Sequence, residues 1–195
     1  MASASYRTLS LKKSEFNKKS FDFVDYKQEK TGLLNEVNER LKELDVKKEE
    51  WIKQHLDVQK YEKSLLKAKE KLEYSLKFNR FGVDYEDLHI RAVITHEYGH
   101  IIADQYIGQI NKWDANPKFD YNSNNKLYQL NQKVEKTYRQ AIKNNDIYNI
   151  SKYAAKNSHE FFAETFAIYD IGREKLPKYI VEMLEEVIEY GKKSM

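Results

Sequence analysis

The stretch that decides the fold is residues 89–108, HIRAVITHEYGHIIADQYIG, which contains the spacing H-E-x-x-H at residues 96–100. Apolar residues flank this motif on both sides, and their pattern predicts a helix. On a helix, residues four apart project from the same face, so the imidazoles of His96 and His100 can meet one tetrahedral zinc ion. Glu97 lies one residue round from His96, close enough to reach a water but badly placed to bind the metal. The motif therefore predicts a zinc site with two histidine ligands and Glu97 as general base.

A catalytic zinc site of this type needs a third protein ligand. The candidate donors lie in residues 151–167, SKYAAKNSHEFFAETFA. If this segment is one continuous helix, four polar side chains fall on a single stripe without a lysine. They are Tyr153, Asn157, Glu160 and Glu164. An acidic face exposed to solvent is the alternative interpretation.

HEYGH followed by Y-x-x-x-N-x-x-E-F-F-A-E-x-F, residues 153–166, resembles the catalytic domain of anthrax toxin lethal factor and its relatives. These proteins are zinc metallopeptidases of the zincin class, in which a glutamate on a second helix is the third ligand. A similar pairing of motifs occurs in peptidase-like domains of phage and mobile-element head proteins. The resemblance covers His96 to Ile188 and includes a closing segment, LPKYIVEMLEEVIEY. It implies a zincin-like metallopeptidase core with the HExxH helix and a second helix that bears the glutamate.

Position by position, the resemblance implies that Glu160 is the third zinc ligand, that Tyr153 supports the oxyanion, and that Glu164 orients a ligating histidine. Glu164 as the direct ligand, with Glu160 behind it, remains the main alternative. His159 is a weaker candidate, because one residue of rotation turns it about 100° away from the stripe. Glu160 follows His100 by 60 positions, an interval longer than the family leads us to expect.

These residues predict a zinc-dependent metalloendopeptidase that holds one Zn²⁺ per chain and hydrolyses a peptide or protein substrate through a metal-activated water. Two other hypotheses stay open. One is a zincin-like structural module of a phage or mobile element that binds zinc without turnover. The other is a helical interaction protein in which the metal only adds stability.

The N-terminal segment, residues 1–82, is expected to begin with a small β-hairpin. Two short stretches alternate as strands do, Tyr6–Leu11 and Phe21–Tyr26. The core is expected to span residues 83–195, so the predicted fold class is predominantly α, or α+β at most.

Residues 33–78 contain neither Gly nor Pro, and Gly32 and Gly82 lie just outside them. Apolar residues recur at spacings of three and four, which predicts one long helix or a helical hairpin with a break near Asp45. Charged residues interrupt the seam at Lys48, Glu62 and Lys69. They favour packing within the same chain over self-association through Leu33–Phe78, although both remain open.

The core is expected to contain four further helices and a polar loop. The helices are predicted from about Asp84–Asp87 to Gly108, over 126–143, over 151–171 and over 177–190, with the loop at 111–125. A turn is expected between the second and third of these helices, at 144–149.

The composition excludes several classes of protein. The 33% charged residues and the lack of 18 consecutive apolar residues argue against a membrane protein. The absence of cysteine excludes a disulfide scaffold, a thiolate zinc site and a cysteine nucleophile. A net charge of +3 is too small to indicate a nucleic-acid partner. The first residues lack a secretory signal, so the expected location is the cytoplasm unless the chain is part of a longer protein.

Overall fold

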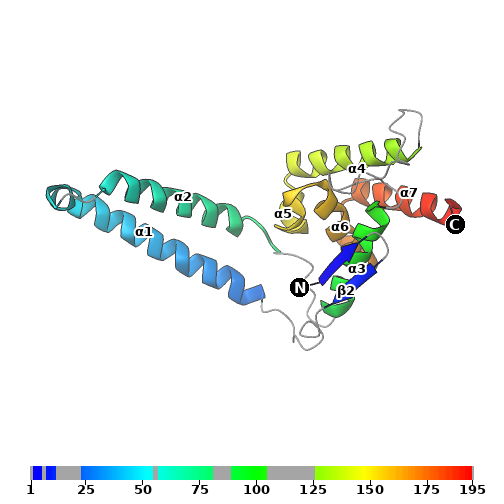
Figure 1. Cartoon of the computed structure of the whole chain (residues 1–195), viewed down its shortest axis with the longest axis horizontal. Coiled ribbons are helices and arrows are strands. Elements are labelled where there is room, and N and C mark those ends of the chain that lie inside the picture. Colours follow the sequence, from blue (N-terminus) through cyan, green and yellow to red (C-terminus); the bar gives the residue numbers. More distant parts are fainter. Residues whose placement is uncertain are drawn as a thin grey trace. The chain divides into compact units, whose positions relative to one another are not determined.

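The computed structural model describes residues 2–5, 8–11, 23–54, 57–80, 89–104 and 126–194 of the 195 residues. These residues form a predominantly helical fold with one two-stranded sheet (Figure 1). The predicted mostly helical class is thereby confirmed. Among the described residues, no helix combines the length and apolar character needed to cross a bilayer.

The described part of the chain begins with two strands and four α-helices, continues with a short α-helix, and ends with two longer helices, each preceded by a 3₁₀ turn. In order they are β1 (Ala2–Ser5), β2 (Thr8–Leu11), α1 (Phe23–Lys53), α2 (Val58–Leu76), α3 (His89–Ile102), α4 (Lys126–Lys143), α5 (Ile147–Ile150), η4 (Ala154–Lys156), α6 (Ser158–Gly172), η5 (Arg173–Lys175) and α7 (Lys178–Ser194).

Contacts divide the chain into two compact units. One unit is Asp22–Phe78, and the other combines Met1–Phe21 with Asn79–Met195. The expected first segment, residues 1–82, therefore differs from the observed unit Asp22–Phe78 at both its first and its last residue. The strands group with the C-terminal unit because both of them contact α3.

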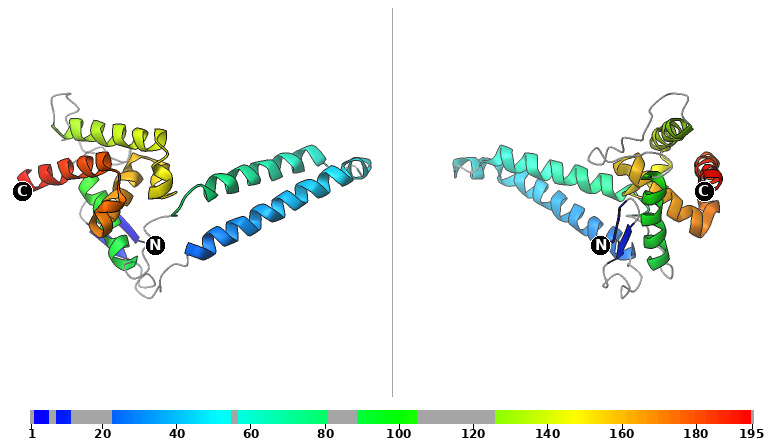
Figure 2. Two further views of the ribbon diagram at one scale, coloured as in Figure 1. Left: turned by 180° about the vertical axis from the view of Figure 1, so that it is seen from behind. Right: turned by 45° about the vertical axis from the view of Figure 1, so that its right-hand side comes forward.

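In the first unit, α1 and α2 pack side by side as a helical hairpin (Figures 1 and 2). The break lies between Lys53 and Val58 rather than near Asp45, which is inside α1. Asp57 explains its position, because its carboxylate accepts a hydrogen bond from the Lys60 backbone N–H at 3.0 Å and caps α2.

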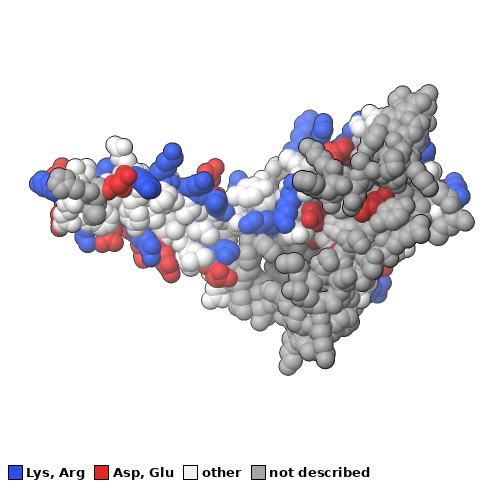
Figure 3. Space-filling view, in the orientation of Figure 1, with Lys and Arg blue, Asp and Glu red and all other residues white. Residues whose placement is uncertain are grey.

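The hairpin also accounts for two of the three charged interruptions of the seam. Lys48 on α1 reaches Glu62 on α2 with 3.0 Å between Nζ and Oε2, while Lys69 pairs along α2 with Glu73 at 3.9 Å. Elsewhere on this unit, residues of both charge signs are interspersed over the surface (Figure 3). The seam therefore packs within the chain, and self-association stays a prediction.

The predicted strand Phe21–Tyr26 is wrong over its helical part, because α1 already begins at Phe23. A helix that gains one hydrogen bond per added residue extends easily through a short alternating stretch with no strand partner. Gly32 also lies inside α1, where a Cβ would meet nothing within 4 Å. An exposed helix tolerates such a glycine at a cost of about 1 kcal/mol.

The β-hairpin exists, but with a different partner strand. β2 lies within the predicted stretch Tyr6–Leu11 and pairs antiparallel with β1, in the register that joins Ala2 to Leu11 and Ser5 to Thr8. Both strands lie against α3 (Figure 2).

In the second unit, α3 and α6 pack against each other, and α4 and α7 pack on α6. The core is formed by fully buried apolar side chains of α4, α6 and α7: Leu130, Val134, Phe161, Phe162, Ile180, Met183 and Leu184. The helix predicted over 126–143 is confirmed. The last helix runs to Ser194, so it passes through Gly191 instead of ending before it.

The helix predicted over 151–171 is divided, and the predicted turn at 144–149 is partly helical, because α5 begins at Ile147. Asn157 adopts an extended conformation between η4 and α6, and its side-chain oxygen accepts from the Glu160 N–H at 2.8 Å. This cap starts α6 at Ser158. The loop predicted at 111–125 and the predicted ends of the third helix, at 84–87 and Gly108, lie outside the described residues.

Candidate metal centre

The centre is built where α3 crosses α6, and Gly99 sets the distance between the two helices. A Cβ on Gly99 would lie 3.0 Å from the Ala163 Cα and 3.4 Å from the Phe166 Cβ. Only glycine allows this approach without displacing backbone. The two variable positions of the HExxH motif are therefore not equivalent. This role of Gly99 was not predicted from the sequence. The small side chain of Ala163 in the facing segment was the one sign that two helices could approach closely there.

This close approach brings three donor atoms together. The Nε2 atoms of His96 and His100 are 3.2 Å apart. The Glu160 Oε2 lies 3.2 Å from the His100 Nε2 and 3.6 Å from the His96 Nε2. The three residues form a group that could hold a metal ion.

The spacing of the three donors fits a tetrahedral ion. Metal–ligand bonds of about 2.0–2.2 Å place neighbouring ligands of a tetrahedron roughly 3.3–3.6 Å apart, close to the three distances observed here. The Glu160 Oε2 is buried and has no hydrogen-bond partner within the described part of the chain. A buried carboxylate oxygen without a donor is costly, and a bound cation would satisfy it.

Glu164 lies on the other side of the His96 ring. Its Oε1 is 3.0 Å from the His96 Nδ1, and only 1% of the residue is exposed. The two glutamates are thus placed differently, Glu160 at the Nε2 atoms of both imidazoles and Glu164 at the Nδ1 of His96. A carboxylate in the second position orients the ring and selects its tautomer.

The pKa values of the two imidazoles are shifted in opposite directions. Burial works against the charged form of His96, but the Glu164 carboxylate and other nearby carboxylates outweigh it and raise the pKa of His96. Burial lowers the pKa of His100, with further lowering from the neighbouring histidines. For Glu160, burial would raise the pKa, but the His100 and His96 imidazoles hold it below the usual value. The lowered pKa values of His100 and Glu160 favour the deprotonated forms that bind a metal, whereas the raised pKa of His96 favours a proton that a bound ion would have to displace.

Tyr153 reaches the centre although it is not on α6. It lies just before η4, so the continuous stripe assumed from the sequence does not form. Its ring centroid is nevertheless 5.9 Å from that of His96, and the Lys156 ammonium lies 3.2 Å over the tyrosine ring. The turn at η4 brings this tyrosine toward α3. Helical periodicity could not predict this position, because residues 153–157 do not continue α6.

Glu97 is buried on α3, with 9% of the residue exposed. None of the described residues forms a hydrogen bond or ion pair with its carboxylate. Its charge helps to raise the pKa of His96, which places it electrostatically near the donor group.

A second link joins α3 to α6 beyond the donor group. The Arg91 guanidinium contacts both Asp170 carboxylate oxygens, at 2.8 and 3.0 Å, and the Thr95 hydroxyl donates to Asp170 at 3.2 Å. The sequence analysis did not identify this link, because nothing in the spacing of these residues marks them as partners. It holds the helices together one turn before His96.

His159 does not belong to the donor group. Its ring stacks on His100 with centroids 4.2 Å apart, and its Nε2 lies 3.4 Å from the Asp104 Oδ1. Asp104 was not singled out from the sequence, since its partner is distant in the chain.

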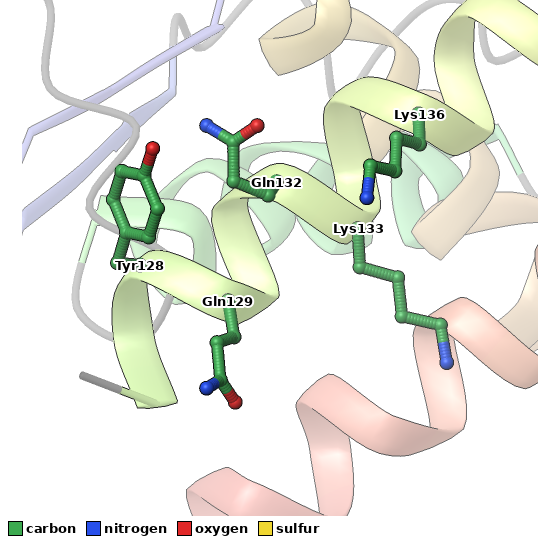
Figure 4. A pocket seen from close by; sticks show the side chains of 5 residues that line it. All are labelled: Tyr128, Gln129, Gln132, Lys133 and Lys136. Atoms are coloured by element: carbon green, nitrogen blue, oxygen red, sulfur yellow. The ribbon is translucent and has the colours of Figure 1, made fainter. Parts of the chain in front are cut away.

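The described residues that line a pocket elsewhere on this unit all belong to α4, among them Tyr128, Lys133 and Lys136 (Figure 4). It shares no lining residue with the donor group, and Lys133 there pairs with Glu186 of α7. Comparisons with protein-family models, with curated proteins and with solved structures found no match to this chain.

Proposed function

We propose that this protein is a zinc-dependent metallopeptidase that hydrolyses peptide bonds of a peptide or protein substrate. The proposal is carried by one observation: three donor atoms of His96, His100 and Glu160 have the spacing of a tetrahedral site, and Glu97, the residue after His96 on α3, is buried. Three protein donors leave the fourth corner of a tetrahedron for water or substrate, as in catalytic zinc sites.

In this proposal, His96, His100 and Glu160 hold the ion. When bound, zinc supplies Lewis-acid polarisation of the scissile carbonyl and lowers the pKa of its water to about 7. Imidazole and carboxylate donors without a thiolate suit zinc, although such a set also accepts other divalent transition metals.

Glu97 takes the proton from the attacking water and later delivers it to the leaving amine. Its position one residue from His96 directs it toward the reacting water rather than toward the metal. Burial keeps bulk water from competing for its carboxylate.

Tyr153 donates a hydrogen bond to the oxyanion of the tetrahedral intermediate, and the contact of its ring with His96 supports this role. The Glu164 Oε1 lies 3.0 Å from the His96 Nδ1, and in this proposal the contact orients the ring and keeps the opposite nitrogen available for the ion. Neither residue is required as a ligand.

The decisive experiment combines zinc analysis with peptide cleavage. Purified protein should contain about one equivalent of zinc and cleave members of a peptide library, and a chelator should abolish cleavage. The Glu97→Gln variant should keep its zinc and its fold but lose hydrolysis. The His100→Ala variant should lose the metal, whereas Glu182→Gln, at an exposed position of α7, serves as the control that changes neither.

Each outcome has a separate meaning. Less than about 0.1 equivalent of zinc after gentle purification would overturn the metal site. Full zinc content without cleavage of any peptide would favour a module that binds metal without turnover. Undiminished activity in Glu97→Gln would overturn the assignment of the base alone.

A further inference from the structure

The two histidines of the donor group are held in different ways. The Nδ1 of His96 faces the Glu164 carboxylate at 3.0 Å. Neither Nδ1 makes a well-aligned hydrogen bond to a described residue. The carboxylate contact of His100, with Glu160, is made by its Nε2 and leaves its Nδ1 without a facing carboxylate among these residues. Histidine ligands are normally oriented through a hydrogen bond from the nitrogen that does not bind the metal. The orientation of His100 therefore needs another source.

The His159 ring supplies a flat surface against His100. The two ring centroids are 4.2 Å apart and the planes differ by only 22°, so the rings are stacked. His159 is in the first turn of α6, next to Glu160. That turn is fixed by the Asn157 cap, because the Asn157 oxygen accepts from the Glu160 N–H at 2.8 Å. One turn of α6 thus presents a donor and a stacking partner together.

Asp104 holds His159 from the other helix. Its Oδ1 lies 3.4 Å from the His159 Nε2. Asp104 follows His100 by four residues, in a segment at the end of α3 whose backbone is π-helical. Both side chains are about three-quarters buried, with 23% and 28% of their surfaces exposed. The contacts run from His100 to His159 to Asp104 and return to α3.

We propose that His159 is a positioning residue that keeps the His100 ring in the orientation in which its Nε2 faces the metal, and that Asp104 anchors His159 in this position. The inference rests on the proposed metal centre and adds that one ligand is oriented by stacking instead of by a carboxylate. The His159 Nε2 contacts the Asp104 carboxylate, and His159 is not part of the donor group.

The test compares zinc affinity in variants that keep or remove the ring. Competition with a chromophoric chelator measures the dissociation constant of wild type, His159→Ala, His159→Phe and Asp104→Ala. His159→Ala should bind zinc about tenfold more weakly, as expected when a group that supports a ligand is lost. His159→Phe should stay close to wild type because it keeps an aromatic face for His100. Asp104→Ala should fall between them.

Cobalt substitution provides a spectroscopic readout. The visible spectrum of the Co²⁺ protein should have the same shape in wild type and His159→Phe, since the ligand set does not change. Tyr98→Ala is the matched control: its ring lies 6.3 Å from Phe166 across the same helix pair but touches no donor residue. This control should leave zinc affinity unchanged.

Three results would overturn the inference while leaving the metal centre intact. One is wild-type affinity in His159→Ala, another is a loss in His159→Phe as large as in His159→Ala, and the third is an equal loss in Tyr98→Ala. Absence of zinc from the wild-type protein would instead overturn the proposed function and the inference with it. If His159→Ala fails to fold by circular dichroism, the contrast between His159→Phe and Asp104→Ala decides: equal affinities of these two variants contradict the inference.

Discussion

The helix pairs α1–α2 and α3–α6 are packed by opposite means. The α1–α2 hairpin uses a long apolar seam and leaves large side chains on its outside, among them Val46 with 84% of its surface exposed. The α3–α6 pair meets at a glycine and buries ionisable groups, including Glu164 with 1% exposed. The first pair depends on the amount of apolar area, and the second depends on the fit of particular atoms.

The difference follows from the cost of burial. Apolar side chains stabilise a contact roughly in proportion to the area they remove from water, so many sequences can build a hairpin. A buried charge without a partner costs several kcal/mol, so the polar residues of α3 and α6 must be matched one by one. Substitutions should therefore affect stability in the hairpin and both stability and metal binding at the helix crossing.

The largest expected effect on stability is in the hairpin. Leu44 is fully buried and lies on the same face of α1 as Lys48, which pairs with α2. Leu44→Ala should lower the free energy of unfolding by about 2–5 kcal/mol without changing zinc content. Urea denaturation and metal analysis measure the two quantities, and Val46→Ala is the exposed control. A loss of zinc in the folded Leu44→Ala protein would break the comparison.

The next effect reports on the helix crossing. Gly99→Ala places a methyl group 3.0 Å from the Ala163 Cα, and overpacking of this kind costs about 1–3 kcal/mol. The helices must separate, so zinc affinity should fall as well. Thermal unfolding with and without added zinc measures both effects. Wild-type affinity in Gly99→Ala would show that the close approach does not position the donors.

The same substitution in α1 should have the opposite sign. Gly32→Ala adds a methyl group that meets nothing within 4 Å, so the better helix propensity of alanine should stabilise the protein by about 0.5–1 kcal/mol. The unfolding midpoint should rise while zinc affinity stays constant. Equal signs for Gly32→Ala and Gly99→Ala would remove the distinction between the two helix pairs.

The smallest effect concerns the Arg91–Asp170 link. The Arg91 guanidinium holds the pKa of the Asp170 carboxyl below its usual value. A carboxyl whose pKa is lowered in the folded state stabilises above its unfolded pKa, and this contribution is lost as the pH falls through the folded value. Asp170→Asn should therefore be slightly less stable than wild type near pH 7, and the difference should begin to shrink near pH 4 and vanish only below the lowered pKa of Asp170. Denaturation curves over this range test it, and a difference that persists in acid would exclude the ion pair as its cause.

The sequence analysis predicted elements with strong local patterns and missed those that depend on a partner. The helix over 126–143 followed from apolar periodicity alone. The strand partner of β2 could not be identified, because β1 reads ASAS, and its small side chains give the alternation little hydrophobic contrast. The break between η4 and α6 was missed because Asn157 fits a helical stripe as well as it fits a cap.

At the candidate site, the HExxH motif on one helix indicated the two histidines and Glu97. The polar stripe farther along the chain indicated a glutamate. Residue spacing left Glu160 and Glu164 as alternatives. Their distances to opposite nitrogens of the imidazoles depend on how α6 crosses α3. The same crossing explains why Asp104 and His159, which are 55 residues apart, could not be paired beforehand.

Sequence alone determined that the chain is mainly helical and that His96 and His100 share one helix face, because both properties depend on neighbours within a few residues. Tertiary structure decided which glutamate approaches their Nε2 atoms, what supports each ring, and why residue 99 is glycine. These properties arise between helices that are separated along the chain. Their distances are set by side-chain packing, which no local pattern encodes.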